Sequence, residues 1–560
     1  KERQSEGQEE REAVMSRSCL IFGRGAVLAG ATCAVIALAL GADGAPAVAA
    51  SSAAGSTSAR PNIILILADD LGFADLGCYG SEIQTPTLDR LAANGLRFTQ
   101  FYNTARCWPT RACLMSGYYA QQIRMDPPQG RLPDWASLLP HRLKPLGYRS
   151  YHSGKWHVRA APRPVADGGF EHSYWFEDWD RYFSPAKHYV DDEQAPPVSP
   201  DSGYYATTAF TDRAIGFLQD HAAHCAGEPF FLYLAFIAPH FPLQALEEDI
   251  APVRDRYLAG WDTIRDQRYQ RQRELGVVDC ALSPPEPGFT PRYFKPEVLD
   301  TLGPGEIPHA IPWSDLTAQQ KRFQATKMAI HAAMITRMDR EIGRLVAKLQ
   351  QMDVLNNTLL LFLSDNGTDA TVMVRGEGHD PAARPGSWRS FLCLGPGWST
   401  VGNTPFRRHK IWVHEGGIAT PLIVHWPAGI TDRGQWRHDV GHVIDVVPTV
   451  LEAAGAKSDA TSAGSGPPLP GRSLIPTLAR DGALNRDGLY FNHQGNRALR
   501  VGDWKVVSAR EDGDAWELYD LRNDRSEMHN LAAQEPDRVQ AMVARWESLT
   551  NEFQKQAGSP

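Results

Sequence analysis

The chain has 560 residues, of which 42% are hydrophobic and 22% are charged, a composition that is typical of globular proteins and excludes a disordered or fibrous chain. Its formal net charge is −8 at pH 7. It therefore lacks the positive field that nucleic-acid binding requires, and we expect no nucleic acid among its partners.

The first 50 residues have the pattern of an N-terminal extension followed by a secretory signal peptide. Residues 1–14 are charged and precede the first methionine, Met15. Arg17 and Arg24 follow this methionine. An apolar run then covers 26–40, and small residues of the A-x-A type lie within 45–50. The apolar run is shorter than the ~20 residues that a transmembrane helix needs. We therefore expect an exported protein, periplasmic or secreted, with no stable membrane span once the leader is cleaved; a leader retained as an anchor is the alternative.

Buried strands and helices alternate along the next 400 residues or so. Continuous apolar runs rich in β-branched residues predict strands at 61–70, 147–157, 229–240, 357–367 and 420–426. Apolar periodicity and capping residues predict helices at 85–95, 204–221 and 317–351. This alternation favours an α/β fold with a mostly parallel sheet that helices cover on both faces.

The character of the sequence changes after about residue 455. A polar segment rich in glycine and proline covers 457–471, and the short strand-like pieces LYFNH, RALRV, WKVVS and WELYD follow it. A terminal helix is predicted from Pro536 to about Gln554. We therefore predict a catalytic domain over 60–455 and a smaller C-terminal α+β subdomain over 456–560, with a short antiparallel sheet.

The cysteines that follow the leader are scattered and contain no C-x-x-C pair, so neither a zinc site nor a dense disulfide framework is expected. Most of them read as small buried hydrophobic residues. Cys107 differs because a helix-like stretch begins at this residue, and a helix N-terminus lowers the pKa of a thiol and attracts anions. The residues alone leave two readings open, a reactive cysteine in an anion pocket or a buried structural thiol.

Polar side chains gather where four of the predicted strands end. They are Asp69 and Asp70, Lys155 and His157, His240, and Asp365 with Asn366. In open α/β sheets, ligands bind at the carboxyl ends of the strands. Each group alone is also compatible with a turn, a helix cap or a structural histidine. Their joint occurrence favours a functional site.

Four of these side chains offer only oxygen ligands: Asp69, Asp70, Asp365 and Asn366. Hard oxygen ligands select Ca²⁺ or Mg²⁺, and a flexible site with a bidentate carboxylate favours Ca²⁺. With the cations Arg111, Lys155 and Lys410 nearby, an ion there would form a strongly positive pocket. Such a pocket suits a compact oxyanion such as sulfate or phosphate.

The segment from Cys107 to Arg111 matches the C-x-P-x-R motif of type I sulfatases. Further matching segments are GKWH (154–157), APHFPLQA (238–245), LSDNG (363–367), HKIWVHEGGIATPLIVHWP (409–427), GNRALRVGDWKVV (495–507) and LYDLRNDRSEMHNLA (518–532). The chain therefore resembles the type I, formylglycine-dependent sulfatase family over residues 60–550 or so, most of all its bacterial arylsulfatase branch. This resemblance implies an alkaline-phosphatase-like fold. Thr110 and the stretch after Asn366 depart from the family pattern, which leaves the substrate specificity open.

The resemblance also implies how the reaction proceeds. A maturation enzyme would convert Cys107 to Cα-formylglycine, and one hydroxyl of the hydrated aldehyde would attack sulfur and form a covalent sulfo-enzyme intermediate. The implied ligands of the metal are Asp69, Asp70, Asp365, Asn366 and an oxygen of residue 107. Arg111 and Lys155 would hold the hydrate, and His157 would act as the base that releases sulfate. His240 and Lys410 would bind the sulfate oxygens and stabilise or protonate the leaving group.

The leading hypothesis is therefore the hydrolysis of a small-molecule or carbohydrate sulfate monoester by a sulfatase of the arylsulfatase type. One alternative is a phosphodiester or phosphonate monoester hydrolase of the same superfamily. Another is an exported homologue that binds sulfate esters without catalysis.

Overall fold

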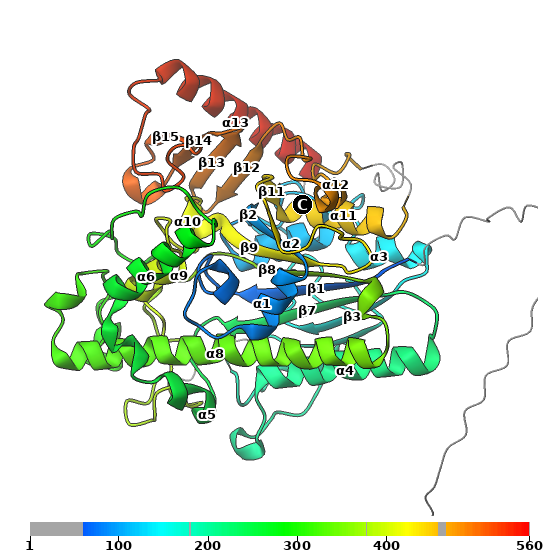
Figure 1. Cartoon of the computed structure of the whole chain (residues 1–560), viewed down its shortest axis with the longest axis horizontal. Coiled ribbons are helices and arrows are strands. Elements are labelled where there is room, and N and C mark those ends of the chain that lie inside the picture. Colours follow the sequence, from blue (N-terminus) through cyan, green and yellow to red (C-terminus); the bar gives the residue numbers. More distant parts are fainter. Residues whose placement is uncertain (1–59, 179–180, 377, 457–465, 559–560) are drawn as a thin grey trace, which may run out of the picture. The chain divides into compact units, whose positions relative to one another are not determined.

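The computed structural model describes residues 60–558 except 179–180, 377 and 457–465. The predicted leader lies outside these residues. In the described part, the centre of the molecule is an 11-stranded sheet in the order β10-β2-β9-β8-β1-β7-β3-β4-β5-β6, with β11 paired to β2 (Figure 1). The strands are β1 (Asn62–Asp69), β2 (Leu96–Tyr102), β3 (Arg149–Gly154), β4 (His172–Phe176), β5 (His188–Val190), β6 (Glu193–Gln194), β7 (Phe230–Pro239), β8 (Thr358–Ser364), β9 (Ala419–His425), β10 (Gln435–Arg437) and β11 (Gly441–His442).

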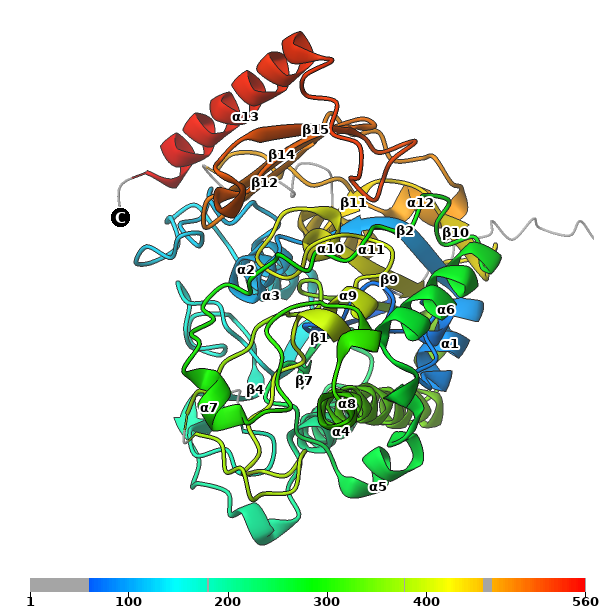
Figure 2. The same ribbon diagram turned by 90° about the vertical axis from the view of Figure 1, so that its left-hand side faces the viewer.

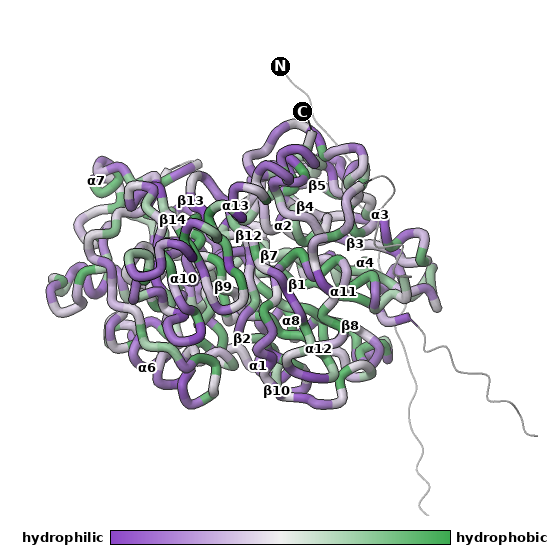
Figure 3. Tube along the Cα trace, turned by 90° about the horizontal axis from the view of Figure 1, so that it is seen from above, coloured by the Kyte–Doolittle hydropathy of each residue, from purple (hydrophilic) through white to green (hydrophobic). Residues whose placement is uncertain are grey.

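The sheet is mostly parallel, as predicted, and all five predicted strands are present. The central strands β8, β1, β7, β3 and β4 run parallel to one another. β9 instead lies antiparallel to both β8 and β2, and β5 and β6 form an antiparallel edge. In Figure 3, hydrophobic segments of the chain gather in the region of these central strands.

Two groups of helices cover the two faces of the sheet. Ile64 and Ile66 of β1 pack in one core with α1, α4 and α8, whereas Ile63 and Leu65 pack in a second core with α2, α3 and α11. Because successive strand residues point to opposite faces, a strand that is buried on both faces has to be a continuous apolar run. The helices are α1 (Pro86–Ala93), α2 (Cys107–Ser116), α3 (Leu139–Leu143), α4 (Ala206–His224), α5 (Glu247–Ile250), α6 (Trp261–Glu274), α7 (Val298–Leu302), α8 (Ala318–Gln351), α9 (Pro396–Gly402), α10 (Glu415–Ile418), α11 (Val446–Ala453), α12 (Ile475–Ala479) and α13 (Pro536–Ala557).

The long helix α8 begins where the sequence predicts it. Thr317 is its N-cap, and its side chain and that of Gln320 form a reciprocal capping box. Met328, Ile335 and Met338 on its apolar stripe are fully buried. Among the described residues, no helix is both long and apolar enough to cross a membrane.

A second sheet of four antiparallel strands follows near the C-terminus. Its strands are β12 (Leu489–His493), β13 (Asn496–Val501), β14 (Trp504–Ser508) and β15 (Trp516–Asp520), in sequential order. Helix α13 packs on this sheet through Met542, Trp546 and Phe553 (Figure 2). The four short strands and the terminal helix are confirmed. The boundary at residue 456 stays a prediction.

Candidate active site

The carboxylates predicted at two strand ends lie side by side because β1 and β8 are parallel neighbours in register. Ala68 pairs with Ser364, so the residues that follow each strand emerge at the same edge of the sheet. The amide of Asp365 donates to the carbonyl of Ala68 at 3.1 Å, and the amide of Asp70 lies 3.3 Å from the Asp365 carboxylate. The side chains of Asp69, Asp70 and Asp365 are all buried.

β7 and β3 bring a histidine and a lysine to the same edge. Asp69 pairs with Pro239 of β7, which places His240 directly beside it. On the other side of β7, the amide of Lys155 donates to the carbonyl of Ala235 at 2.7 Å. Lys155 Nζ lies 2.5 Å from Asp69 Oδ2. The four strand ends therefore converge on one site, as predicted.

Gly154 permits this close approach of β3 to β7. A Cβ atom at this position would lie 1.9 Å from the carbonyl oxygen of Ala235, and the backbone has φ of +120°. Only glycine fits such a contact and such a dihedral angle without strain. The G-K-W-H segment thus needs its glycine so that Lys155 can enter the site.

Arg111 connects helix α2 to the carboxylates. Its side chain is fully buried, and it donates to Asp365 Oδ2 from Nη2 at 2.8 Å and from Nε at 3.1 Å. Nη1 donates to the carbonyl of Lys155 at 2.7 Å, and Nη2 lies 3.4 Å from Asp69 Oδ2. This fork fixes the first turns of α2, and so Cys107, against the strand ends.

Lys410 enters from the loop between α9 and α10. Its Nζ lies 2.5 Å from Asp70 Oδ1 and 3.4 Å from Asp369 Oδ2. The two carboxylates outweigh the burial and raise the pKa of Lys410. Asp369 is a site residue that the sequence analysis missed, although it lies in the stretch after Asn366 that departs from the family pattern.

Of the two histidines of the site, His240 is buried and His157 is half-buried. Burial, reinforced by Lys155 and Arg111 for His157 and by Lys410 for His240, holds their pKa values well below the ordinary range. His240 Nδ1 lies 2.5 Å from the carbonyl oxygen of Phe241, so in the neutral ring Nδ1–H donates there. Its Nε2 lies 3.8 Å from Asp70 Oδ2.

Two residues of the site have left-handed backbone conformations. Asp70 has φ of 65° and His157 has φ of 54°. Such conformations of non-glycine residues cost of order 1–3 kcal/mol and cluster at functional sites. Surrounding contacts hold both residues in place; the ring of His157 lies 6.0 Å from that of Trp108.

Cys107 is the first residue of α2, with a 4% exposed side chain. Burial alone would raise the pKa of its thiol, but Lys155 and Lys410 outweigh burial and lower it. The thiol therefore lies in a positive pocket beside the carboxylates. The structure shows that Cys107 is buried, and the choice between a reactive cysteine in an anion pocket and a buried structural thiol stays a prediction.

The donor set fits a hard divalent cation. Asp69 Oδ1, Asp70 Oδ2 and Asn366 Oδ1 are buried and have no hydrogen-bond partner. Asn366 Nδ2 donates to Asp70 Oδ1 at 2.7 Å, which orients the amide oxygen away from that contact. Ligand atoms of Asp69, Asp70 and His240 lie within 4.8 Å of one another. Buried oxygens without partners are costly unless they bind a cation, and oxygen ligands are those that Ca²⁺ and Mg²⁺ prefer.

The pKa values of the cluster agree with this fit. Burial, and then the negative charge of Asp69, raise the pKa of Asp365 to about 7 in spite of Arg111. Burial also raises the pKa of Asp70, in spite of Lys410. An added positive charge would stabilise both carboxylates in their ionised form. All the site residues predicted from the sequence are thus brought together.

The comparisons with known proteins agree with the site. The sequence profile described as Sulfatase matches residues 61–456, and that described as N-sulphoglucosamine sulphohydrolase, C-terminal, matches residues 407–556. An uncharacterized sulfatase of Schizosaccharomyces pombe is 30% identical over 87% of this chain and 93% of its own length. An arylsulfatase of Klebsiella aerogenes is 31% identical over 73% of this chain and 89% of its own.

A solved structure, that of Ps i-CgsB in complex with k-i-k-neocarrahexaose, superposes with a TM-score of 0.62 at 24% identity, over 89% of this chain and 94% of that one. The fold is alkaline-phosphatase-like, as predicted. Because the Sulfatase profile matches most of the chain, the protein belongs to the sulfatase family. It is a sulfuric ester hydrolase.

Proposed function

We propose that the protein hydrolyses sulfate monoesters as an arylsulfatase-type enzyme that uses a nucleophilic oxygen at residue 107, carried by Cα-formylglycine derived from Cys107, and a bound Ca²⁺ ion. The observation that carries this proposal is the position of Cys107. It is buried at the N-terminus of α2, where the charges of Lys155 and Lys410 act on its thiol and a cluster of carboxylates adjoins it.

Asp69, Asp70, Asp365 and Asn366 would hold the metal, with Mg²⁺ as the alternative ion. When present, the ion supplies positive charge against the developing negative charge of the sulfate ester, and formylglycine supplies hydrated-aldehyde oxygens as the nucleophile. The unsatisfied oxygens of three of these side chains support this assignment.

The chain's own residues would orient the reacting groups and move protons. Arg111 and Lys155 are cations that flank Cys107 and would hold a developing negative charge there. His157 has a lowered pKa, so at neutral pH its ring is neutral and able to accept a proton. His240 and Lys410 lie on the Asp70 side of the site, where they would bind the sulfate oxygens and the leaving oxygen.

A cavity beside His157 is suited to the rest of the substrate. It has a volume of about 170 Å³, and its lining includes Lys155, His157, Trp175 and Phe176. Aromatic side chains next to a few polar groups are typical of sites that bind aryl or sugar rings. The similarity to an arylsulfatase supports an aryl ring as the occupant, and the saccharide complex of Ps i-CgsB supports a sugar ring.

The test combines the peptide mass across residue 107 with turnover, in protein from a host that has the formylglycine-generating maturation enzyme. We expect the mass of formylglycine and faster turnover of 4-nitrophenyl sulfate than of the corresponding phosphodiester or phosphonate monoester. Faster turnover of the phosphorus esters would replace the proposal with the superfamily alternative. An intact cysteine with no turnover would favour a homologue that only binds sulfate esters.

We also propose that the protein is exported, because the leader pattern precedes the fold. Cell fractionation with N-terminal sequencing tests this. We expect a mature protein that begins near residue 50 in the periplasm or medium. A full-length chain in the cytoplasm would contradict the proposal.

A further inference from the structure

Three arginines surround the site, and each adjoins one of its residues. Arg106 precedes Cys107, Arg159 is two residues beyond His157, and Arg375 lies over the ring of Phe241, the residue after His240. We refer to Arg106, Arg159 and Arg375 as the arginine rim. None of the three is among the site residues predicted from the sequence.

The rim arginines have no direct ionic partner within the described part of the chain, although Cys107 and Asp369 outweigh burial and raise the pKa of Arg106. No guanidinium of the three makes a hydrogen bond or an ion pair there, and the Nε atoms of Arg106 and Arg375 are buried without a partner. The cations inside the site are different, since Arg111, Lys155 and Lys410 all contact carboxylates. Three cations that make no ion pair with any described residue thus lie at this one place.

Trp108 contacts two of these arginines. The guanidinium carbons of Arg106 and Arg159 are each 5.1 Å from its ring centroid. The ring of Trp108 also contacts those of His157 at 6.0 Å and His493 at 5.3 Å. Cation–π contacts hold the guanidinium groups in place but leave their N–H donors available.

Arg375 lies on the same side of the site as His240. Its guanidinium carbon is 4.5 Å from the centroid of Phe241, whose ring stacks on His240 with 4.4 Å between centroids. The positive charge of Arg375 is one of those that add to burial in lowering the pKa of His240. The Arg375 guanidinium is therefore close enough to the site for its charge to act on His240.

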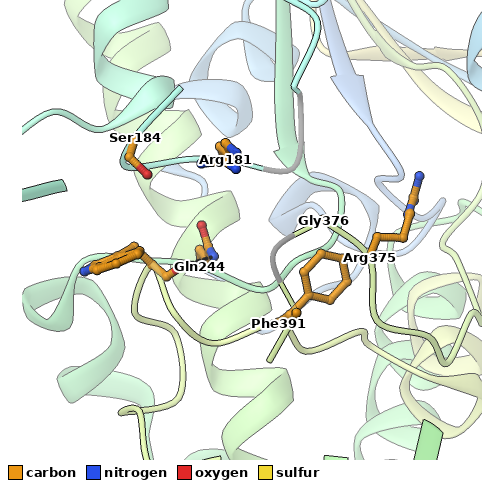
Figure 4. A pocket seen from close by; sticks show the side chains of 8 residues that line it. Arg181, Ser184, Gln244, Arg375, Gly376 and Phe391 are labelled. Carbon is orange, nitrogen blue, oxygen red and sulfur yellow. Dashed lines mark hydrogen bonds between the residues drawn. The ribbon is translucent and has the colours of Figure 1, made fainter. Parts of the chain in front are cut away.

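A small cavity lies next to Arg375. It has a volume of about 40 Å³, and its described lining includes Arg181, Gln244 and Phe391. Figure 4 shows Arg375 across this cavity from Arg181 and Ser184, with its side chain extending away from them. The guanidinium thus projects from the cavity wall rather than filling the cavity.

We propose that the arginine rim binds further anionic groups, sulfate or carboxylate, of a multiply charged saccharide whose scissile sulfate occupies the site. This inference rests on the proposed sulfatase function and names its substrate class. One sulfate needs only the cations inside the site. Three additional guanidinium groups that make no ion pair with a described carboxylate match a substrate that carries several oxyanions. Guanidinium groups bind such oxyanions by paired hydrogen bonds.

The test is competition by a sulfated heparin tetrasaccharide against the hydrolysis of 4-nitrophenyl sulfate, with the desulfated tetrasaccharide in parallel. In the wild-type protein we expect the sulfated form to inhibit with a Ki at least tenfold lower than that of the desulfated form. The R159A/R375A double variant should lose most of this difference, and R375K should retain more of it than R375A. Arg106 is left unchanged because a substitution beside Cys107 would confound its maturation.

Two arginines on the same loops serve as matched controls. Arg163 pairs with Asp167 and Arg389 pairs with Asp380, and both arginines are largely exposed. R163A and R389A should leave the Ki of the sulfated tetrasaccharide within twofold. Equal inhibition by the two tetrasaccharides, or equal effects of rim and control variants, would overturn the inference while the sulfatase function stands.

Direct calorimetric titration of the same two tetrasaccharides separates the two proposals. If 4-nitrophenyl sulfate is not hydrolysed, the proposed function fails, but the rim still predicts tight binding of the sulfated form and weaker binding by R159A/R375A. Absence of that difference overturns the rim inference as well. Thermal unfolding midpoints of every variant show whether each one is folded.

Discussion

Replacing Arg111 with methionine tests whether this side chain organises the site. Methionine has a similar length but no charge, so the change removes two hydrogen bonds to Asp365, one to the Lys155 carbonyl and an ion pair with Asp69. Because the arginine is fully buried, solvent cannot replace these contacts. Removal of one partner from a buried charge network costs about 3–5 kcal/mol of stability.

The same change should also reduce catalysis. Loss of one preorganised donor near a developing negative charge typically lowers kcat by ~10²–10³-fold. R111K retains a positive charge but not the planar fork, so we expect a smaller loss of stability and still a large loss of kcat. The assays are urea unfolding followed by circular dichroism, and kcat and KM with 4-nitrophenyl sulfate.

The control for this experiment is R163M, a change on the exposed surface that should alter neither quantity measurably. The peptide mass at residue 107 is checked in each variant, because an unconverted cysteine would also remove turnover. An R111M protein with the wild-type urea midpoint and more than half of the wild-type kcat would refute the reasoning.

Three further predictions concern the metal, a site residue and the C-terminal sheet. Chelation with EGTA should lower the unfolding midpoint and added Ca²⁺ should restore it, with a stabilisation of about 2.7 kcal/mol at 100 times the dissociation constant; an unchanged midpoint would contradict the metal assignment. D369N should lower kcat/KM about tenfold, a loss of about 1.4 kcal/mol, because Lys410 loses one of its two carboxylate partners; unchanged kinetics would exclude a role for this carboxylate. K505M should lower the free energy of unfolding in urea by about 3–5 kcal/mol. The reason is that the buried Lys505 lies 3.0 Å from Glu415 and 2.7 Å from Glu527. A wild-type midpoint would show that the two glutamates find other partners.

The local parts of the fold could be predicted from the sequence. The continuous apolar runs of β1, β7 and β8 predict strands that are buried on both faces. The cap at Thr317 and the stripe of α8 are likewise encoded within a few residues of where they act. Asp69, Asp70, Asp365 and His240 were found because the carboxyl ends of parallel strands share one edge of a sheet.

Other elements depended on contacts that are distant in the sequence. β2 was missed because its run LRFTQFY includes Arg97, a residue that does not indicate a buried strand. In the structure that arginine stacks 3.9 Å over the ring of Trp436 and donates to the carbonyl of Gly434. The apolar sequence of β9 likewise does not indicate that this strand is antiparallel to β8 and β2. The direction of the strand depends on how the chain returns to the sheet.

The sequence by itself determined the buried strands, the caps of the main helix and the set of residues that meet at the strand ends, because hydrophobic periodicity and motif spacing are local properties. Only the tertiary structure placed Asp369 against Lys410, brought Arg111 to a carboxylate 254 positions away and left the arginine rim without an ion pair among the described residues. Whether a charge is paired depends on which distant segments fold beside it, and local sequence does not contain that information.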